Sequence, residues 1–193
     1  MKIKNVFYSL YARYSIWKAA FKKGYYTYRY TTNASIAPSV FFGKYSEIEI
    51  NSSKAHLLIN EGVYFRKHCH LFLDKNGRLE IGKDVFFNNY CSISCLGNIE
   101  IGENTLFGEG VKMYDHNHKY GVVNSDLVVK KNEFKIGSII IGKKCWIGSN
   151  VTILNNVEIG DNVIIGAGCL IYKSIPANSI VKASLTYDIQ PLI

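Results

Sequence analysis

Two histidines stand two residues apart in a polar stretch, MYDHNHKYG, at residues 113–121. The imidazole of an ordinary histidine titrates near neutral pH, so it can take a proton from a weak nucleophile such as an alcohol, or bind a metal ion. In an extended segment alternate side chains share a face, which places His116 and His118 together and Asp115 and Asn117 opposite them. We therefore expect His118, and not Asp115, to be the neighbour of His116. Taken alone, the stretch favours polar residues of a surface loop over a catalytic base.

This polar stretch interrupts a six-residue repeat. From Ile141 the chain reads IGKKCW, IGSNVT, ILNNVE, IGDNVI, IGAGCL and IYKSIP, six blocks that each begin with isoleucine. Four earlier triplets of blocks keep the same period, and their first residues are Ile36, Phe42 and Ile48; Ile59, Phe65 and Leu71; Ile81, Phe87 and Ile93; Ile101, Phe107 and Met113. A period of six fits neither an α-helix nor a plain β-strand, but it suits a short strand followed by a turn.

The repeat predicts an all-β fold of stacked coils. Glycine follows the apolar residue in eight of the eighteen blocks, as a corner or a close approach of two backbones requires. Three short strands would close one flat-sided coil, and successive coils would bury a ladder of Ile, Val and Phe. We expect a parallel β-helix of about six coils. The chain leaves the repeat between Met113 and Ile141, so a projecting loop is expected there.

The length of 193 residues suits one domain, which we divide into three segments. A helical cap and connector is expected at 1–33 and the repeat at 34–176, with its loop insert at 114–139. A C-terminal tail follows at 177–193.

The N-terminal segment has the pattern of a basic amphipathic helix. Apolar residues recur there at steps of three and four, namely Phe7, Leu10, Tyr11, Tyr14, Trp17 and Phe21. We expect this helix to end at Gly24 and a β-prone connector, YYTYRYTT, to follow. The helix could cap the open end of the coils, as every solenoid requires, or lie on an anionic membrane surface.

The formal net charge of +8 favours anionic partners. No nucleic-acid-binding motif accompanies this charge, so we expect no nucleic-acid partner. No run approaches the roughly 18 apolar residues of a membrane span, and the N-terminus lacks a signal-peptide pattern. The cysteines show no disulfide or CxxC spacing, so we expect a cytoplasmic protein, with membrane contact only at the periphery.

Three features together resemble the hexapeptide-repeat, left-handed β-helix acyltransferases, in particular the bacterial sugar O-acetyltransferases of the maltose, galactoside and capsular-polysaccharide type. They are the repeats from Ile36 to about Pro176, the YDHNH insert, and IGKKCWIGSNVTI at 141–153. The resemblance implies a left-handed β-helix, a homotrimer with acetyl-CoA bound between parallel β-helices, and no metal. Two stretches differ from the family pattern: the C-terminal VKASLTYDIQPLI and the non-acidic N-terminus.

The resemblance also implies roles for single residues. His116 matches the general base, and Asn89 in FNNYCS, or its neighbour Asn88, matches an asparagine that hydrogen-bonds the acceptor. Trp146 matches the tryptophan of the acetyl-CoA channel, and the backbone N–H of Ser149 matches the donor to the thioester carbonyl. The other residues that we expect beside the cofactor are Gly148, Gly166 and Lys173.

These residues fit acyl transfer from a thioester to a hydroxyl, which needs a base and a preorganised donor for the oxyanion but no covalent enzyme intermediate. The expected activity is therefore an acetyl-CoA-dependent O-acetyltransferase acting on a sugar or polysaccharide-precursor hydroxyl, with His116 as base and His118 as its neighbour. The family architecture also hosts N-acetyltransferases of amino-sugar nucleotides and serine acetyltransferases, and a fold does not decide the acceptor. A non-enzymatic scaffold is a further alternative.

Cysteine and metal chemistry are disfavoured. Four of the five cysteines occupy the fifth position of a block, where small or β-branched residues otherwise stand: Cys69, Cys91, Cys145 and Cys169. We interpret them as small buried hydrophobes. The metal-dependent carbonic anhydrases share the coil architecture, but they need three histidines on one zinc, and here His68 and His70 fall in other coils than His116.

Overall fold

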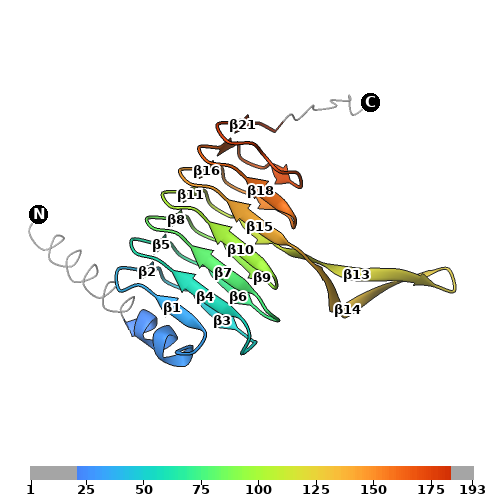
Figure 1. The fold of residues 1–193 in the computed structure, drawn as a ribbon, viewed down its shortest axis with the longest axis horizontal. Helices are drawn as coiled ribbons and strands as arrows, with labels where there is room; N and C mark the ends of the chain where they lie inside the picture. Colours follow the sequence, from blue (N-terminus) through green and yellow to red (C-terminus); the bar gives the residue numbers. More distant parts are fainter. Residues whose placement is uncertain (1–20, 184–193) are drawn as a thin grey trace, which may run out of the picture.

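The computed structural model describes residues 21–183. The chain winds into a parallel β-helix whose coils stack in one direction, and one long antiparallel hairpin projects from its side (Figure 1). Three sheets run along the stack, and each coil contributes one strand to each of them. The predicted all-β architecture of six stacked coils with a projecting segment is confirmed.

The three sheets consist of very short strands. Sheet A contains β1 (Ala34–Ile36), β4 (His56–Ile59), β7 (Arg78–Ile81), β10 (Asn98–Ile101), β15 (Ser138–Ile141) and β18 (Val157–Ile159). Sheet B contains β2 (Phe41–Phe42), β5 (Tyr64–Phe65), β8 (Phe86–Phe87), β11 (Leu106–Phe107), β16 (Trp146–Ile147), β19 (Ile164–Ile165) and β21 (Ile180–Val181). Sheet C contains β3 (Glu47–Ile50), β6 (His70–Leu73), β9 (Ser92–Cys95), β12 (Lys112–Tyr114), β17 (Thr152–Ile153) and β20 (Leu170–Ile171).

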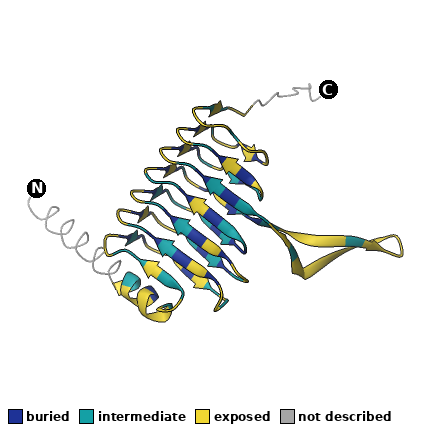
Figure 2. Ribbon diagram, viewed as in Figure 1, coloured by how far each residue is buried: buried dark blue, intermediate teal, exposed yellow. Residues whose placement is uncertain are grey.

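The repeated apolar residues form the core between the three sheets (Figure 2). On sheet B the rings of Phe42, Phe65, Phe87 and Phe107 stack in register, with successive centroids 5.1, 4.8 and 4.7 Å apart. All four are at most 2% exposed, and burial of such a side chain contributes about 1.5–3 kcal/mol. The six-residue period therefore produces the coil because it returns each large apolar residue to the same inner row.

Glycine in the second position of a block is required by the close stacking of the coils. A Cβ atom at Gly102 would lie 2.5 Å from the carbonyl carbon of Gly142 in the next coil. The corner has no room for a side chain, which confirms the reason inferred from the repeat.

Two expectations for the first segment were wrong. The helix does not end at Gly24, because residues 21–29 are helical, and the aromatic stretch is therefore not a β-like connector. Tyr26 is buried, and its ring packs edge-on against Phe42 at 5.7 Å while Tyr30 stacks on it at 6.4 Å. A helix sets Tyr26 and Tyr30 one turn apart, so both rings reach the first coil, and this packing outweighs the β propensity of the stretch.

The described part of this helix lies across the open end of the first coil (Figure 1). Lys23 donates a hydrogen bond from Nζ to the carbonyl of Pro38, and the hydroxyl of Tyr26 donates to the carbonyl of Ser46 at 3.4 Å. Of the apolar residues on which the amphipathic pattern rests, Phe21 is exposed and the others lie outside the described residues. Between residues 21 and 183 the structure has no helix long and apolar enough to span a membrane.

The repeat continues beyond the expected boundary at residue 176. Strand β21 pairs in parallel with β19, with Ile180 opposite Ile164 and Val181 opposite Ile165. The predicted tail therefore begins with one more strand of sheet B, and residues 184–193 lie outside the described part.

The insert is a β-hairpin, which we call the arm, and not an irregular loop. It consists of β13 (His116–Val123) and β14 (Asp126–Ile136), with a register shift between His118 and Tyr120. Figure 2 shows that nearly all of its length is exposed. Its base lies where sheet C turns toward sheet A, so the first residues of the arm are held by the coils.

Candidate active site

The expected site residues fall on two edges of the β-helix. The turns from sheet B to sheet C form the B–C edge, and the turns from sheet C to sheet A form the C–A edge. The B–C edge carries Asn89, Gly148, Ser149 and Gly166, and Trp146 precedes it on sheet B; the C–A edge carries His116, His118 and Lys173. Each strand residue advances about 3.3 Å, so the width of sheet C separates the edges by roughly 15–20 Å. Within one chain the structure does not bring the two groups together.

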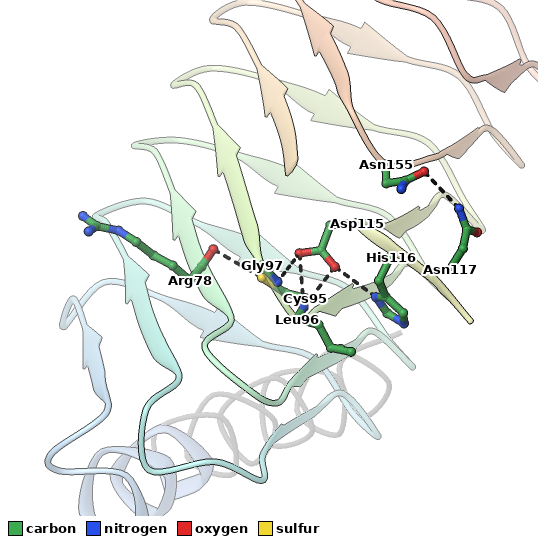
Figure 3. Close-up of polar contacts among 8 residues, drawn as sticks. All are labelled: Arg78, Cys95, Leu96, Gly97, Asp115, His116, Asn117 and Asn155. Carbon is green, nitrogen blue, oxygen red and sulfur yellow. Dashed lines mark hydrogen bonds and ion pairs between the residues drawn. The ribbon is translucent and has the colours of Figure 1, made fainter. Parts of the chain in front are cut away.

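On the C–A edge, a buried carboxylate occupies the point where the arm leaves the coil (Figure 3). Asp115 has no exposed side-chain surface. Its Oδ1 accepts the N–H of Leu96 at 2.9 Å, and its Oδ2 accepts the N–H groups of Leu96 and Gly97 at 3.1 and 2.7 Å. Charge-assisted bonds of this kind hold a buried carboxylate in one orientation.

The same carboxylate contacts His116, whose Nδ1 lies 3.0 Å from Asp115 Oδ1. Because an ionised carboxylate only accepts hydrogen bonds, the imidazole donates its Nδ1–H and keeps the Nε2 lone pair available for a proton. The side chain of His116 is 14% exposed, so it meets solvent at a restricted opening. This arrangement suits a general base held in one tautomer.

The expectation that Asp115 would point away from His116 is wrong. A bend at Asp115 separates β12 from β13, so the alternation of a continuous strand does not pass through this residue. The N–H groups at Leu96 and Gly97 then draw the carboxylate to the coil edge. The sequence contained one signal for this, the short step of eight residues between Ile93 and Ile101, which leaves room for only a two-residue connector.

Phe134 of strand β14 supports both histidines. Its ring lies edge-on to His116 at 5.2 Å and tilted against His118 at 4.6 Å, so the two histidines do share a face of the arm. His118 is exposed, and its Nδ1 is 3.2 Å from the carbonyl oxygen of Lys130. His116 is therefore held by the coil, whereas His118 is held by the arm alone.

The base of the arm has a further connection to the coils. The side-chain amide of Asn117 donates to Oδ1 of Asn155 at 3.1 Å (Figure 3). The N–H of Gly137 donates to the carbonyl of Asp115 at 2.7 Å. Both strands of the arm are thus fixed where they leave the β-helix, beside His116.

On the B–C edge, the two candidate asparagines have different surroundings. Asn88 Oδ1 accepts from the N–H of Asn89 at 2.8 Å and from Arg66 Nη1 at 3.1 Å. Asn89 Oδ1 accepts the N–H of Lys67 at 3.2 Å, and its Nδ2 donates to Glu109 Oε2 at 3.2 Å. Asn89 therefore bridges three successive coils.

The turn after Trp146 presents a backbone donor. Gly148 donates its N–H to Ile165, and Ser149 Oγ accepts the N–H of Glu109 at 3.2 Å. Within residues 21–183 the Ser149 N–H has no hydrogen-bond acceptor. The Trp146 side chain is 58% exposed on the outer face of sheet B. Gly166 lies one coil beyond Gly148, and the Lys173 ammonium lies 5.7 Å from the ring centre of its neighbour Tyr172.

The structure supports the interpretation of the cysteines as buried residues. All five are free and buried. The pKa of the Cys95 thiol is raised, mainly by its burial and in second place by the nearby Asp115 carboxylate. A nucleophilic cysteine requires a lowered pKa instead. No group of three or more metal-binding side chains occurs in the described part of the chain.

Comparison with known proteins agrees with this architecture. Residues 138–173 match the bacterial transferase hexapeptide repeat. These residues therefore carry the repeat that defines the hexapeptide-repeat transferases. The chain is 32% identical over 131 residues to WbbJ of Escherichia coli, which is named as a lipopolysaccharide biosynthesis O-acetyl transferase, and the match covers 64% of this chain and 66% of that protein. It is 30% identical over 106 residues to YvoF of Bacillus subtilis, named as an acetyltransferase, over 54% of this chain and 55% of that protein.

The chain therefore spans between about half and two thirds of these relatives. Among solved structures, the hexapeptide-repeat fold is similar to that of AntD, an N-acyltransferase of Bacillus cereus, with a TM-score of 0.58 and 21% identity over 77% of this chain and 76% of that chain. A hexapeptide-repeat-containing acetyltransferase of Vibrio cholerae gives a TM-score of 0.52 and 21% identity over 61% and 64%. At this identity the likeness concerns the fold.

Proposed function

We propose that this hexapeptide-repeat protein is an acetyl-CoA-dependent O-acetyltransferase that acts on a hydroxyl of a sugar or polysaccharide precursor. The observation that carries the proposal is the Asp115–His116 pair. It is a base held by a buried carboxylate on the C–A edge, where the arm leaves the coil. The names of the two curated relatives support acetyl transfer, and that of WbbJ supports a saccharide acceptor.

In the proposed reaction, His116 Nε2 accepts the proton of the acceptor hydroxyl while the hydroxyl oxygen attacks the carbonyl carbon of the thioester. The Asp115 carboxylate stabilises the imidazolium that results. The Ser149 N–H donates to the oxyanion of the tetrahedral intermediate. As the carbon–sulfur bond breaks, His116 returns the proton to the CoA sulfur, so the products are the acetyl ester and free CoA.

This mechanism needs two chains. His116 and Ser149 lie on different edges, roughly 15–20 Å apart within one chain, whereas the reacting atoms must lie within a few ångströms of both groups. We therefore propose a homotrimer in which the C–A edge of one chain faces the B–C edge of the next. We also place the protein in the cytoplasm, where its five cysteines would stay reduced.

The first test is calorimetric titration with acetyl-CoA, because it requires no knowledge of the acceptor. We expect one site per chain with a Kd in the micromolar to sub-millimolar range. An absence of binding at millimolar acetyl-CoA would overturn the proposal. A positive result leads to a screen of saccharides by mass spectrometry for the gain of one acetyl group. Removal of that group by hydroxylamine distinguishes an ester from an amide product.

A further inference from the structure

The B–C edge of the first three coils carries aromatic rings at strained backbone positions. Tyr45, His68 and Tyr90 have φ angles of 62, 58 and 61°. Positive φ is unfavourable for bulky side chains, and Gly or Asn is the usual choice. The equivalent positions in the next three coils follow this rule, with Gly110, Asn150 and Gly168. Strain of this kind is concentrated at functional positions.

These three residues, which we call the aromatic ladder, stack on one another outside the coil. The rings of Tyr45 and His68 are 4.8 Å apart, and those of His68 and Tyr90 are 4.9 Å apart. Stacking offsets part of the strain. However, Tyr90 remains 55% exposed, and the phenylalanine ladder inside the coil already stabilises the same coils. The position of the ladder is therefore better explained by contact with another molecule, such as a ligand bound between two chains, than by the stability of one chain.

The ladder ends in a step that suits a sugar ring. Above Tyr90 the next coil has Gly110, which has no side chain, so no aromatic residue of that coil covers the upper face of the Tyr90 ring. A Cβ atom at Gly110 would lie 2.5 Å from Asn150 Oδ1, so this amide oxygen reaches down from the coil above. The step is bounded by the Tyr90 ring on the side of the third coil and by Asn150 Oδ1, a hydrogen-bond acceptor, on the side of the fifth coil. Adjacent coils lie about 4.8 Å apart, close to the spacing of stacked rings.

Basic side chains lie beside the lower part of the ladder. Arg66 and Lys67 are exposed in the same turn as His68, and Lys67 donates its backbone N–H to Asn89. Among the B–C turns of the first four coils, the one acidic residue is Glu109. Its carboxylate already accepts a hydrogen bond from the side-chain amide of Asn89. From the second to the fifth coil, the B–C edge thus presents the cations of Arg66 and Lys67, the ring of Tyr90, the amide of Asn150 and the N–H of Ser149. These groups extend over roughly 15 Å.

We propose that this edge is the acceptor subsite and that the acceptor is an anionic saccharide, with one ring stacked on Tyr90 and its phosphate or carboxylate beside Arg66 and Lys67. The assignment rests on the proposed function, because it places the acceptor below the Ser149 N–H. It deepens that function by naming the charge and orientation of the acceptor.

The test measures probe binding to the full chain by saturation-transfer NMR and acceptor KM by a coupled assay of CoA release. The probes are a phosphorylated disaccharide, a glucuronate-containing disaccharide and neutral maltose. We expect wild type to bind at least one anionic probe more tightly than maltose, and the preferred probe distinguishes phosphate from carboxylate. Equal or absent binding of all three would overturn the proposal.

Two variants sharpen the test. Tyr90→Gly removes the ring at a position where glycine is favoured, so folding is retained while KM for the anionic probe rises about tenfold and the Kd of acetyl-CoA stays the same. Lys67→Gln weakens binding of the anionic probe about fivefold and leaves binding of maltose unchanged. The matched control is Asn104→Gly, at φ 58° in the turn between β10 of sheet A and β11 of sheet B, which changes neither the KM for the anionic probe nor the Kd of acetyl-CoA.

The outcomes separate the two proposals. Unchanged KM in Tyr90→Gly and Lys67→Gln, with transfer intact in wild type, would overturn the subsite alone. Probe binding that depends on Tyr90, in a protein that does not bind acetyl-CoA, would keep the subsite and overturn the acetyltransferase.

Discussion

The C–A and B–C edges of the β-helix present functional groups in different ways. On the C–A edge the chain leaves the coil, and the interruption creates a buried carboxylate that accepts from Leu96, Gly97 and His116. On the B–C edge no insertion occurs, and the groups are backbone N–H donors and side chains that point outward from uniform turns. An interruption can thus hold one reactive side chain firmly, whereas a regular edge offers a row of binding positions.

The largest effect is expected at the C–A edge, from His116→Ala. Loss of the base should lower kcat by about 10²–10⁴, the usual contribution of general-base catalysis. The Kd of acetyl-CoA should stay unchanged, because the expected cofactor residues other than Lys173 lie on or beside the other edge. Steady-state kinetics and calorimetry provide both values. A fall in kcat of less than threefold would contradict the assignment of the base.

Mixing His116→Ala with Asn89→Ala, which we expect to be inactive because Asn89 matches the asparagine that binds the acceptor, tests whether the edges come from different chains. His116→Ala and Asn89→Ala each damage one edge, so random mixed trimers contain some interfaces with both edges intact. If the site lies between chains, about a quarter of the wild-type activity should return after co-expression or refolding together. A site contained in one chain predicts no recovery. Mixing each variant with itself is the control.

A smaller effect is expected from Asp115→Asn. An amide cannot accept from Leu96, Gly97 and His116 as a carboxylate does, so the His116 tautomer is no longer held. We expect kcat to fall about 10–100-fold and the free energy of unfolding to fall by about 1–3 kcal/mol, the range for a disrupted buried polar group. Urea unfolding and kinetics measure the two losses. Wild-type kcat in a folded Asp115→Asn protein would show that the carboxylate has only a structural role.

The smallest effect is expected from His118→Ala. The side chain is exposed and contacts Phe134 and the Lys130 carbonyl, both within the arm. We expect kcat to change by less than about threefold, within the range of a surface substitution. A loss as large as that of His116→Ala would place His118 in the reaction and remove the distinction between coil-held and arm-held histidines.

The errors in the first segment and at Asp115 have a common physical origin. YYTYRYTT has β-prone residues, and Gly24 is a common helix stop, but the rings of Tyr26 and Tyr30 gain more by packing on the first coil. Asp115 belongs to an extended stretch by pattern, yet N–H groups at Leu96 and Gly97, nearly twenty residues away in sequence, determine its orientation. Local patterns do not contain such distant partners.

The sequence by itself determined the coil, its three-sided repeat and the place where the arm leaves it. These follow from spacing alone, since a large apolar residue every six positions and a glycine after it permit one regular way to stack. Only the tertiary structure decided that Asp115 holds His116, that the expected site residues lie on two separate edges, and that aromatic rings stack along one of them. Each of these depends on residues that are distant in sequence and become neighbours when successive coils stack.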